Sequence, residues 1–510
     1  MRTIRRGVVG AALAVLATAA PAPADRAAEL GERLRKAIHA RSTGFFAGAS
    51  FEGATVQPDR SAIRVLHGPN ADSRDVLLGT RYAVPASGRP FVNVLTTYSA
   101  PPKSAEATPM TTAPESFVEL LSSRARIGWG APPAGRPVTN ALYEFGGGYP
   151  DPGSFPYDGL VDATSRMMKA EGAEALTYGE AQGYRGLREL VCHKYGLFEG
   201  LKVGPENIII SNGSGHALSL AFSAFVDPGD VIVSEAPTFS GTLQTIRRHG
   251  PQVLDVPVDK DGLVVEVARR HLADLRKQGR RCKLIYTIVN FQNPSGPSLT
   301  LKRRRELIDL AHEYDTLILE DDAYGELRFE GEHLPSLYAL DGGGRVLRAG
   351  TVSKILGAGF RLGWLCAPKE MIPAFQGFLF GGGVNPFASR VATYFLRDNL
   401  APHVARLVNV YRAKRDAMLR GLWELLKDTD VEISKPEGGF FIWIRLPTGT
   451  DTGKLYEGAV AARVQYTAGP SFFPNGGGER FIRLAFSFES PERCYEGARL
   501  IARAILDARA

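Results

Sequence analysis

The sequence predicts an α/β fold, with a large domain built on a mostly parallel sheet sandwiched by helices and a smaller α+β domain after it. Two observations carry this prediction. From about residue 163, short apolar strands alternate with segments whose apolar residues recur at helical spacing, the pattern of a parallel sheet covered on both faces. After residue 396 the pattern changes to a long helix, alternating strands and a closing helix, which is typical of a smaller α+β domain.

The first 24 residues have the three parts of a secretory signal: basic residues, an apolar run, then small residues and prolines. The apolar run is too short to span a bilayer. The pair Arg5-Arg6 followed by Gly7 also resembles a twin-arginine signal. A mis-assigned start codon and an Arg-rich organelle transit peptide are the other interpretations, and in every case this segment lies apart from the fold.

The chain is long enough for more than one domain, with 510 residues. Residues 25–114 open with a helical pattern and continue into Pro- and Gly-punctuated stretches, and "APPKSAEATPMTTAPES" has the composition of a linker. We expect 25–114 to be an extension of unknown structure, 115–170 an N-terminal arm with part of the small domain, 171–395 the large domain with the parallel sheet, and 396–510 the C-terminal small domain.

Charge and cysteine content exclude several functions. The net charge of +7 is spread along the chain without a dense basic run, so a nucleic-acid partner is not expected. Nor is a stable membrane anchor. Four cysteines lie far apart with no CxxC spacing, and we expect buried apolar residues rather than disulfides or a metal site.

Polar and aromatic residues follow one predicted strand after another, where open parallel sheets bind ligands. The residues at these strand ends are Ser214, Gly215, His216, Phe239, Asn293, Asp321, Tyr324, Ser353 and Lys354, with Arg361 seven residues on. Each alone has an ordinary explanation as a turn, a core residue or a solvated charge. Together they supply what pyridoxal 5'-phosphate requires: a phosphate cup, an aromatic face, a donor to the ring oxygen, an acid opposite the ring nitrogen and a lysine to bond covalently.

From about Glu115 to the C-terminus, the chain resembles the class I/II aminotransferases of fold type I, which depend on pyridoxal phosphate. It looks closest to the branch of 2-aminoadipate, kynurenine and aromatic amino acid aminotransferases. The motifs that carry the resemblance are "FGGGYPDPGSFP", "LTYGEAQGYRGLREL", "SNGSGHALSL", "EAPTF", "NPSG", "DDAYGEL", "SKILGAGFRLGW" and "RFIRLAFS".

The resemblance implies a role for each matching residue. Lys354 would bond the cofactor and then carry the proton between the substrate Cα and the cofactor, and Asp321 would pair with the ring nitrogen. Arg483 would bind the substrate α-carboxylate. Tyr324 and Asn293 would hydrogen-bond the ring oxygen, and Phe239 would stack on the ring. The phosphate would be bound by Ser214, Gly215, Ser353 and Arg361, and Tyr178 would reach the phosphate of a neighbouring subunit. Asn293 and the loop containing Gly147 and Gly148 would contact the substrate.

Two positions depart from the family pattern. Phe239 stands where many relatives have tyrosine, so stacking is kept and a hydroxyl contact is lost. The phosphate cup has Ser214-Gly215-His216 where the branch more often has Ser-Gln-Gln. His216 would then either donate to the phosphate or point into the helix packing.

The implied function is amino-group transfer between an α-amino acid and a 2-oxo acid, with 2-oxoglutarate as the expected acceptor, in ping-pong order. A homodimer with shared active sites and a cytoplasmic location are family expectations, with export or organelle targeting as the alternatives that residues 1–24 raise. A lyase or decarboxylase on the same fold would share Asp321 and Lys354. A transcription regulator with an aminotransferase-like domain is the remaining alternative, but no second recognition helix with a basic face follows the N-terminal helical pattern.

Overall fold

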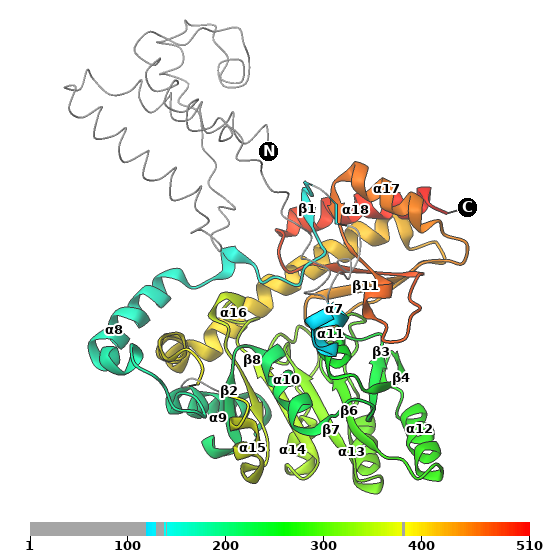
Figure 1. Ribbon diagram of the computed structural model, residues 1–510. Helices are drawn as coiled ribbons and strands as arrows, with labels where there is room; N and C mark the ends of the chain where they lie inside the picture. Colours follow the sequence, from blue (N-terminus) through cyan, green and yellow to red (C-terminus); the bar gives the residue numbers. More distant parts are fainter. Residues whose placement is uncertain (1–118, 129–136, 139, 380–382, 510) are drawn as a thin grey trace, which may run out of the picture. The chain divides into compact units, whose positions relative to one another are not determined.

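The computed structural model describes residues 119–128, 137–138, 140–379 and 383–509 (Figure 1). The signal-like segment 1–24 and the extension 25–114 lie outside the described residues. Residues Leu121–Ala510 form one compact unit, which opens with the short helix α7 (Ser123–Gly128). None of the helices in the described ranges is both long and apolar enough to span a bilayer.

Within the described residues, the large sheet has eight strands in the order β2-β9-β8-β7-β6-β3-β4-β5. The strands are β2 (Ile208–Ser211), β3 (Val231–Ala236), β4 (Gln252–Asp259), β5 (Gly262–Leu263), β6 (Cys282–Ile288), β7 (Leu317–Asp322), β8 (Val346–Thr351) and β9 (Gly363–Cys366). Pairing is parallel from β4 through β3, β6 and β7 to β8, and antiparallel where β9 joins β8 and β2. The predicted mostly parallel sheet is confirmed.

The sheet is covered by helices on both faces, as its apolar strands require. Successive residues of β7 face opposite sides: Leu319 packs in one core with Leu218 of α10 (Ser214–Phe225) and Leu243 of α11 (Ser240–His249). Ile318 packs in the other core with Leu307 of α13 (Leu301–Glu313). Helices α9 (Arg185–Glu199) and α12 (Val265–Lys277) add buried residues to this second core.

The smaller sheet is antiparallel and comes from the C-terminal part of the chain, shown in orange and red in Figure 1. Its order is β10 (Glu432–Ile433), β11 (Phe441–Arg445), β14 (Phe481–Ala485), β13 (Thr467–Ala468). The long helix α16 (Pro386–Leu426) leads into it and packs against α18 (Pro491–Asp507). Strand β1 (Tyr143–Glu144), far earlier in the chain, pairs with β12 (Val464–Gln465), so the segment after β1 is held beside this sheet.

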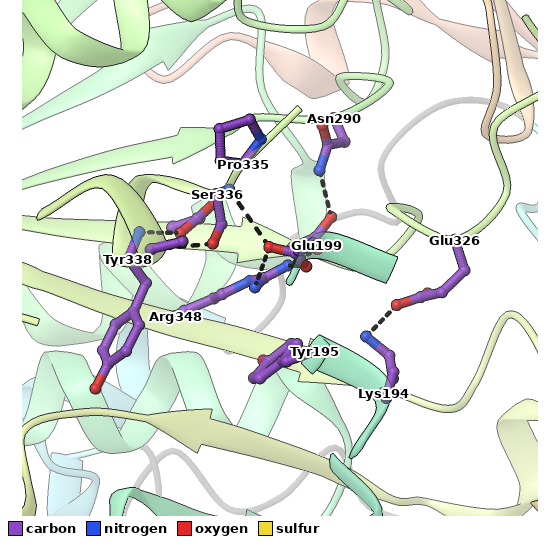
Figure 2. A network of polar contacts seen from close by, with 12 residues as sticks. Lys194, Tyr195, Glu199, Asn290, Glu326, Pro335, Ser336, Tyr338 and Arg348 are labelled. Atoms are coloured by element: carbon purple, nitrogen blue, oxygen red, sulfur yellow. Dashed lines mark hydrogen bonds and ion pairs between the residues drawn. The ribbon is translucent and has the colours of Figure 1, made fainter. Parts of the chain in front are cut away.

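A buried ion cluster ties β7 and β8 to α9 (Figure 2). Arg348 of β8 lies 2.5 Å from both Glu199 of α9 and Asp322 of β7. Lys194 of α9 pairs with Glu326, just after β7. Burial raises the pKa of Asp322, but the charges of Arg348 and then Lys194, with hydrogen bonds from Asn290 and Arg348, outweigh it and hold that pKa well below its usual range, at about 2. The cluster lies under the sheet edge at which the strand-end residues gather.

Candidate active site

The carboxyl ends of the parallel strands bring the predicted residues to one edge of the large sheet. Asp321 is the second-last residue of β7, Lys354 follows β8 by three residues, and Asn293 follows β6. Arg361 precedes β9, and because that strand runs antiparallel to β8 its amino end lies at the same edge. Arg483 and Arg361 both lie close enough to Lys354 to lower its pKa, so this edge gathers positive charge and suits an anionic ligand.

Asp321 is a buried carboxylate with one oxygen left without a partner. Its side chain is 5 % exposed. Its Oδ2 accepts a hydrogen bond of 2.8 Å from the Tyr286 hydroxyl, whereas Oδ1 is buried and has no hydrogen-bond partner. Burial raises the pKa of Asp321 to about 6, and the Tyr286 bond and the Lys354 charge oppose that rise. A buried, unpaired acceptor is unfavourable unless something binds it, so Oδ1 marks a binding position.

Lys354 is the half-buried amine of the same edge. Its Nζ donates a 3.0 Å hydrogen bond to the Gly148 carbonyl and lies 5.5 Å from the centre of the Tyr324 ring. Burial, the nearby Arg483 and Arg361 lower its pKa to about 8, with Asp321 acting in the other direction. A lysine with this pKa has an appreciable neutral fraction near pH 7.5 and is therefore a usable nucleophile and base.

Arg483 of β14 reaches across from the small sheet to the large one. Its Nη1 donates 2.9 Å to Asn293 Oδ1, and its Nη2 donates to the Gly146 carbonyl at 2.5 Å and to Thr467 at 3.3 Å. The guanidinium lies between two aromatic rings, with Nε buried and unpaired. Burial lowers the pKa of Arg483 to about 10, a value at which the side chain stays charged at neutral pH.

The loop Gly146–Gly148 lies against both Lys354 and Arg483 through its carbonyl groups. The amides of Gly146 and Gly147 donate to Glu144 Oε1 at 2.9 and 3.0 Å. A Cβ at Gly148 would come within 2.6 Å of the Phe441 ring. The loop is thus held by hydrogen bonds to Glu144 and packs too closely against Phe441 to allow a side chain at Gly148.

The other end of the site is a close-packed turn at the start of α10. Gly213 has φ 80°, a conformation that favours glycine. Its carbonyl carbon lies so near β9 that a Cβ at Gly363 would come within 2.5 Å of that atom. Arg361 donates 3.1 Å to the Asn212 carbonyl. The first backbone amides of α10 therefore lie near the Arg361 guanidinium, an arrangement that suits a phosphate group.

His216 and Ser353 lie at this end with different surroundings. His216 Nδ1 accepts from the Asn212 amide at 3.2 Å, so the neutral ring carries its proton on Nε2. Burial lowers the pKa of His216, which keeps the ring neutral. Ser353 is bound to Thr351, with the two hydroxyl oxygens 2.8 Å apart.

The two predicted aromatic residues and Tyr178 differ in exposure. Tyr324 is 4 % exposed and burial raises its pKa well above the ordinary value, so its hydroxyl is a donor at all relevant pH. Phe239 is 36 % exposed at the N-cap of α11. Tyr178 is 90 % exposed, and among the residues that the structure describes no hydrogen bond or ring contact joins it to the other site residues.

Sequence reasoning missed several hydroxyl groups that the structure adds to the site: Thr242, Tyr286, Thr351 and Thr467. Tyr286 lies on β6 two residues before Ile288, which pairs with Asp321. The period of two along a strand would have placed Tyr286 on the same face as Asp321 only once the register between β6 and β7 was known.

These groups fit pyridoxal phosphate. The unpaired Asp321 Oδ1 can take the ring nitrogen, and Lys354 Nζ lies near the Tyr324 ring on the next strand end. The turn at Gly213, with Arg361 beside it, offers the phosphate site. Among the described residues, Asp321 Oδ1 is the one buried carboxylate oxygen that has no hydrogen-bond partner.

Comparisons with known proteins agree with this geometry. A family model described as aminotransferase class I and II matches residues 147–490. Aromatic-amino-acid aminotransferase 1 of Thermococcus litoralis is 36% identical over 370 residues, which cover 72% of this chain and 88% of the relative. The 2-aminoadipate transaminase of Thermus thermophilus is 32% identical, over 71% of this chain and 90% of the relative. The crystal structure of Pyrococcus horikoshii kynurenine aminotransferase in complex with PMP superposes with a TM-score of 0.70 at 33% identity, covering 77% of this chain and 96% of that one.

Proposed function

Because the chain belongs to the class I and II aminotransferase family and is a pyridoxal-phosphate-dependent aminotransferase, we propose that it runs two half-reactions in ping-pong order, with 2-oxoglutarate as amino acceptor. The observation that carries the proposal is the convergence of an unpaired buried acid, a lysine of lowered pKa and a buried arginine at one sheet edge. Amino and 2-oxo acids both carry the α-carboxylate that such an arginine binds.

The cofactor would be held by this chain at four places. Asp321 Oδ1 would bind the ring nitrogen, and Tyr324 and Asn293 the ring oxygen. The remaining contacts are the ring face for Phe239 and the phosphate for Ser214, Gly215, His216, Ser353 and Arg361. When bound, pyridoxal phosphate supplies an electron sink for the pair left at Cα after a proton departs.

Lys354 is the residue we assign to proton transfer. Its Nζ would hold the cofactor covalently and, as a free amine, would act as the base that takes the proton from the substrate Cα. The lowered pKa of about 8 leaves part of this amine neutral at physiological pH, which a base needs. Asp321, as an anion, stabilises the positive charge that develops opposite it.

Arg483 is assigned to the substrate α-carboxylate. A carboxylate can replace the Gly146 carbonyl as the acceptor of Nη2, and the unpaired Nε offers a second donor for a bidentate contact. The rings of Phe441 and Phe472, 4.1 and 4.8 Å from the guanidinium carbon, exclude water and strengthen that pair.

A homodimer is part of the proposal, because Tyr178 would serve the site of a second copy. Tyr178 is 90 % exposed, and Tyr157 and Val161 of α8 (Tyr157–Ala175) are 61 % and 71 % exposed. Exposed apolar groups gathered on one segment favour a protein interface. Light scattering of the holoenzyme measures the mass of the oligomer. Tyr178→Phe is expected to weaken cofactor retention and to leave that mass unchanged.

The cytoplasm is the proposed compartment on the family expectation, with export or organelle import as the outcome that the segment 1–24 would produce. Cell fractionation with N-terminal sequencing of the mature chain separates the three. A chain that starts after residue 20 in an exported fraction would contradict the proposal.

Transamination is tested with purified holoenzyme and single amino acids, beginning with aromatic amino acids, kynurenine and 2-aminoadipate. We expect each productive donor to bleach the visible absorption band of the bound cofactor in one turnover, and 2-oxoglutarate to restore it. Release of pyruvate with sulfide, or of carbon dioxide, would indicate a lyase or decarboxylase instead. Lys354→Ala is expected to lose the visible band, and a band that persists in that variant would contradict the assignment of Lys354.

A further inference from the structure

Two buried hydroxyls line up behind Asp321, on the side away from its free oxygen. The Tyr286 hydroxyl lies 2.8 Å from Asp321 Oδ2 and 2.9 Å from Thr242 Oγ1. A hydroxyl has one proton to donate. Because the carboxylate can only accept, Tyr286 gives its proton to Asp321, and Thr242 donates to the Tyr286 oxygen.

Both hydroxyls of this hydrogen-bonded chain lie in the protein interior. Tyr286 is fully buried on β6, and Thr242 is 1 % exposed in the first turn of α11. That turn begins at Phe239, which is expected to stack on the cofactor ring. The chain Thr242–Tyr286–Asp321 therefore connects the first turn of α11, directly after Phe239, to the acid that would bind the ring nitrogen.

The groups around Asp321 shift its pKa in opposite directions. Burial and the charge of Asp322 disfavour a carboxylate at this position, whereas the Tyr286 hydrogen bond and the Lys354 charge favour it. The Tyr286 hydroxyl is the neutral donor whose hydrogen bond favours the ionised form of Asp321.

We propose that Tyr286 and Thr242 are positioning residues that keep Asp321 ionised and leave its Oδ1 free for the ring nitrogen of the cofactor. The inference rests on the proposed role of Asp321. It predicts that the protonation of the ring nitrogen depends on a tyrosine that does not touch the cofactor. A purely structural role for the two hydroxyls predicts a loss of stability alone.

The test compares holoenzymes of the wild type, Tyr286→Phe and the control Tyr195→Phe, which removes an equally buried hydroxyl whose partner is Trp364. Each is loaded with cofactor labelled with ¹⁵N in the ring, and the nitrogen chemical shift reports its protonation. We expect a protonated nitrogen in the wild type and the control, and loss of that proton in Tyr286→Phe. The kcat/KM should fall about 10- to 100-fold in that variant, the usual range for a hydrogen bond to a charged group, through kcat and not KM, since Arg483 is intact.

A cofactor analogue with carbon in place of the ring nitrogen completes the test. With it, Tyr286→Phe and the wild type should turn over at equal rates. A defect that persists with the analogue, or an unchanged nitrogen shift in Tyr286→Phe, would overturn the inference. Thr242→Val gives a second variant, expected to shift the nitrogen signal the same way by less. Asp321→Asn distinguishes the inference about Tyr286 from the proposed role of Asp321. If Asp321→Asn changes the nitrogen signal and Tyr286→Phe does not, only the inference fails. If neither variant changes it, the proposed role of Asp321 fails as well.

Discussion

Replacing Asp321 with asparagine in the cofactor-free protein is expected to change how stability depends on pH. The folded chain raises the pKa of Asp321 from 3.8 to about 6, mainly by burial. An acid whose pKa is raised by folding stabilises the folded state fully below pH 3.8, and this contribution is lost as the pH rises through 6. Each pH unit of that difference is worth about 1.4 kcal/mol, so the wild type loses about 3 kcal/mol relative to Asp321→Asn between pH 4 and pH 8.

Thermal unfolding of the two cofactor-free proteins measures this difference. The compact unit Leu121–Ala510 should unfold with an entropy of about 0.8 kcal/mol per kelvin, so about 3 kcal/mol corresponds to about 4 °C in Tm. We expect Asp321→Asn to gain about this much on the wild type on going from pH 4 to pH 8. Asp428→Asn removes an exposed carboxylate (side chain 88% exposed) and controls for the loss of one charge. A Tm difference that stays constant with pH, or that moves the other way, would refute the argument that Asp321 is held in a desolvated site.

Three further variants test separate parts of the site and the fold. Arg483→Lys keeps the charge but loses the planar fork, so KM for the amino donor should rise about 10- to 100-fold while the absorption spectrum of the bound cofactor stays unchanged; a normal KM would contradict the carboxylate assignment. Gly213→Ala places a Cβ on a residue with φ 80°, 3.0 Å from the nearest guanidinium nitrogen, and should weaken cofactor binding in a fluorescence titration, whereas Gly200→Ala, with φ 67° and no atom within 4 Å, should not. Arg348→Met leaves Glu199 and its neighbours in the ion cluster unpaired and should destabilise the fold by about 3–5 kcal/mol in calorimetry; an unchanged Tm would show that the cluster is not needed for stability.

The strand-end rule explains why so much of the site could be predicted. Parallel strands deliver their carboxyl ends to one edge whatever the details of pairing, so Asp321 and Lys354 were expected near each other before the order of strands was known. The structure places Asp321 on β7 and Lys354 just after the neighbouring strand β8. Their roles, and those of the other site residues, stay predictions until the variants are measured.

The contacts between distant segments could not be predicted from local patterns. Arg483 bonds Asn293 across 190 residues, from a different sheet, and the position of Tyr286 beneath Asp321 depends on strand register. Glu199 and Arg348 each resemble an ordinary helix or strand charge in the sequence, yet they pair in the core. Hydrophobic periodicity reports which face of an element is buried, not which residue it meets there.

The three consecutive acids of β7 have a consequence for how this strand finds its alignment. A strand that is apolar on both faces can slide by one residue without exposing anything apolar to water, so its hydrophobic residues do not fix its position. Glu320 accepts from the amides of Leu337 and Tyr338, Asp321 from Tyr286, and Asp322 pairs with Arg348. A slip in either direction would leave an apolar residue against one of these donors, or an acid without any. The three acids at the end of β7 therefore select one alignment of the strand with its neighbours during folding. In that alignment Asp321 is the acid that faces Tyr286 and the proposed cofactor site.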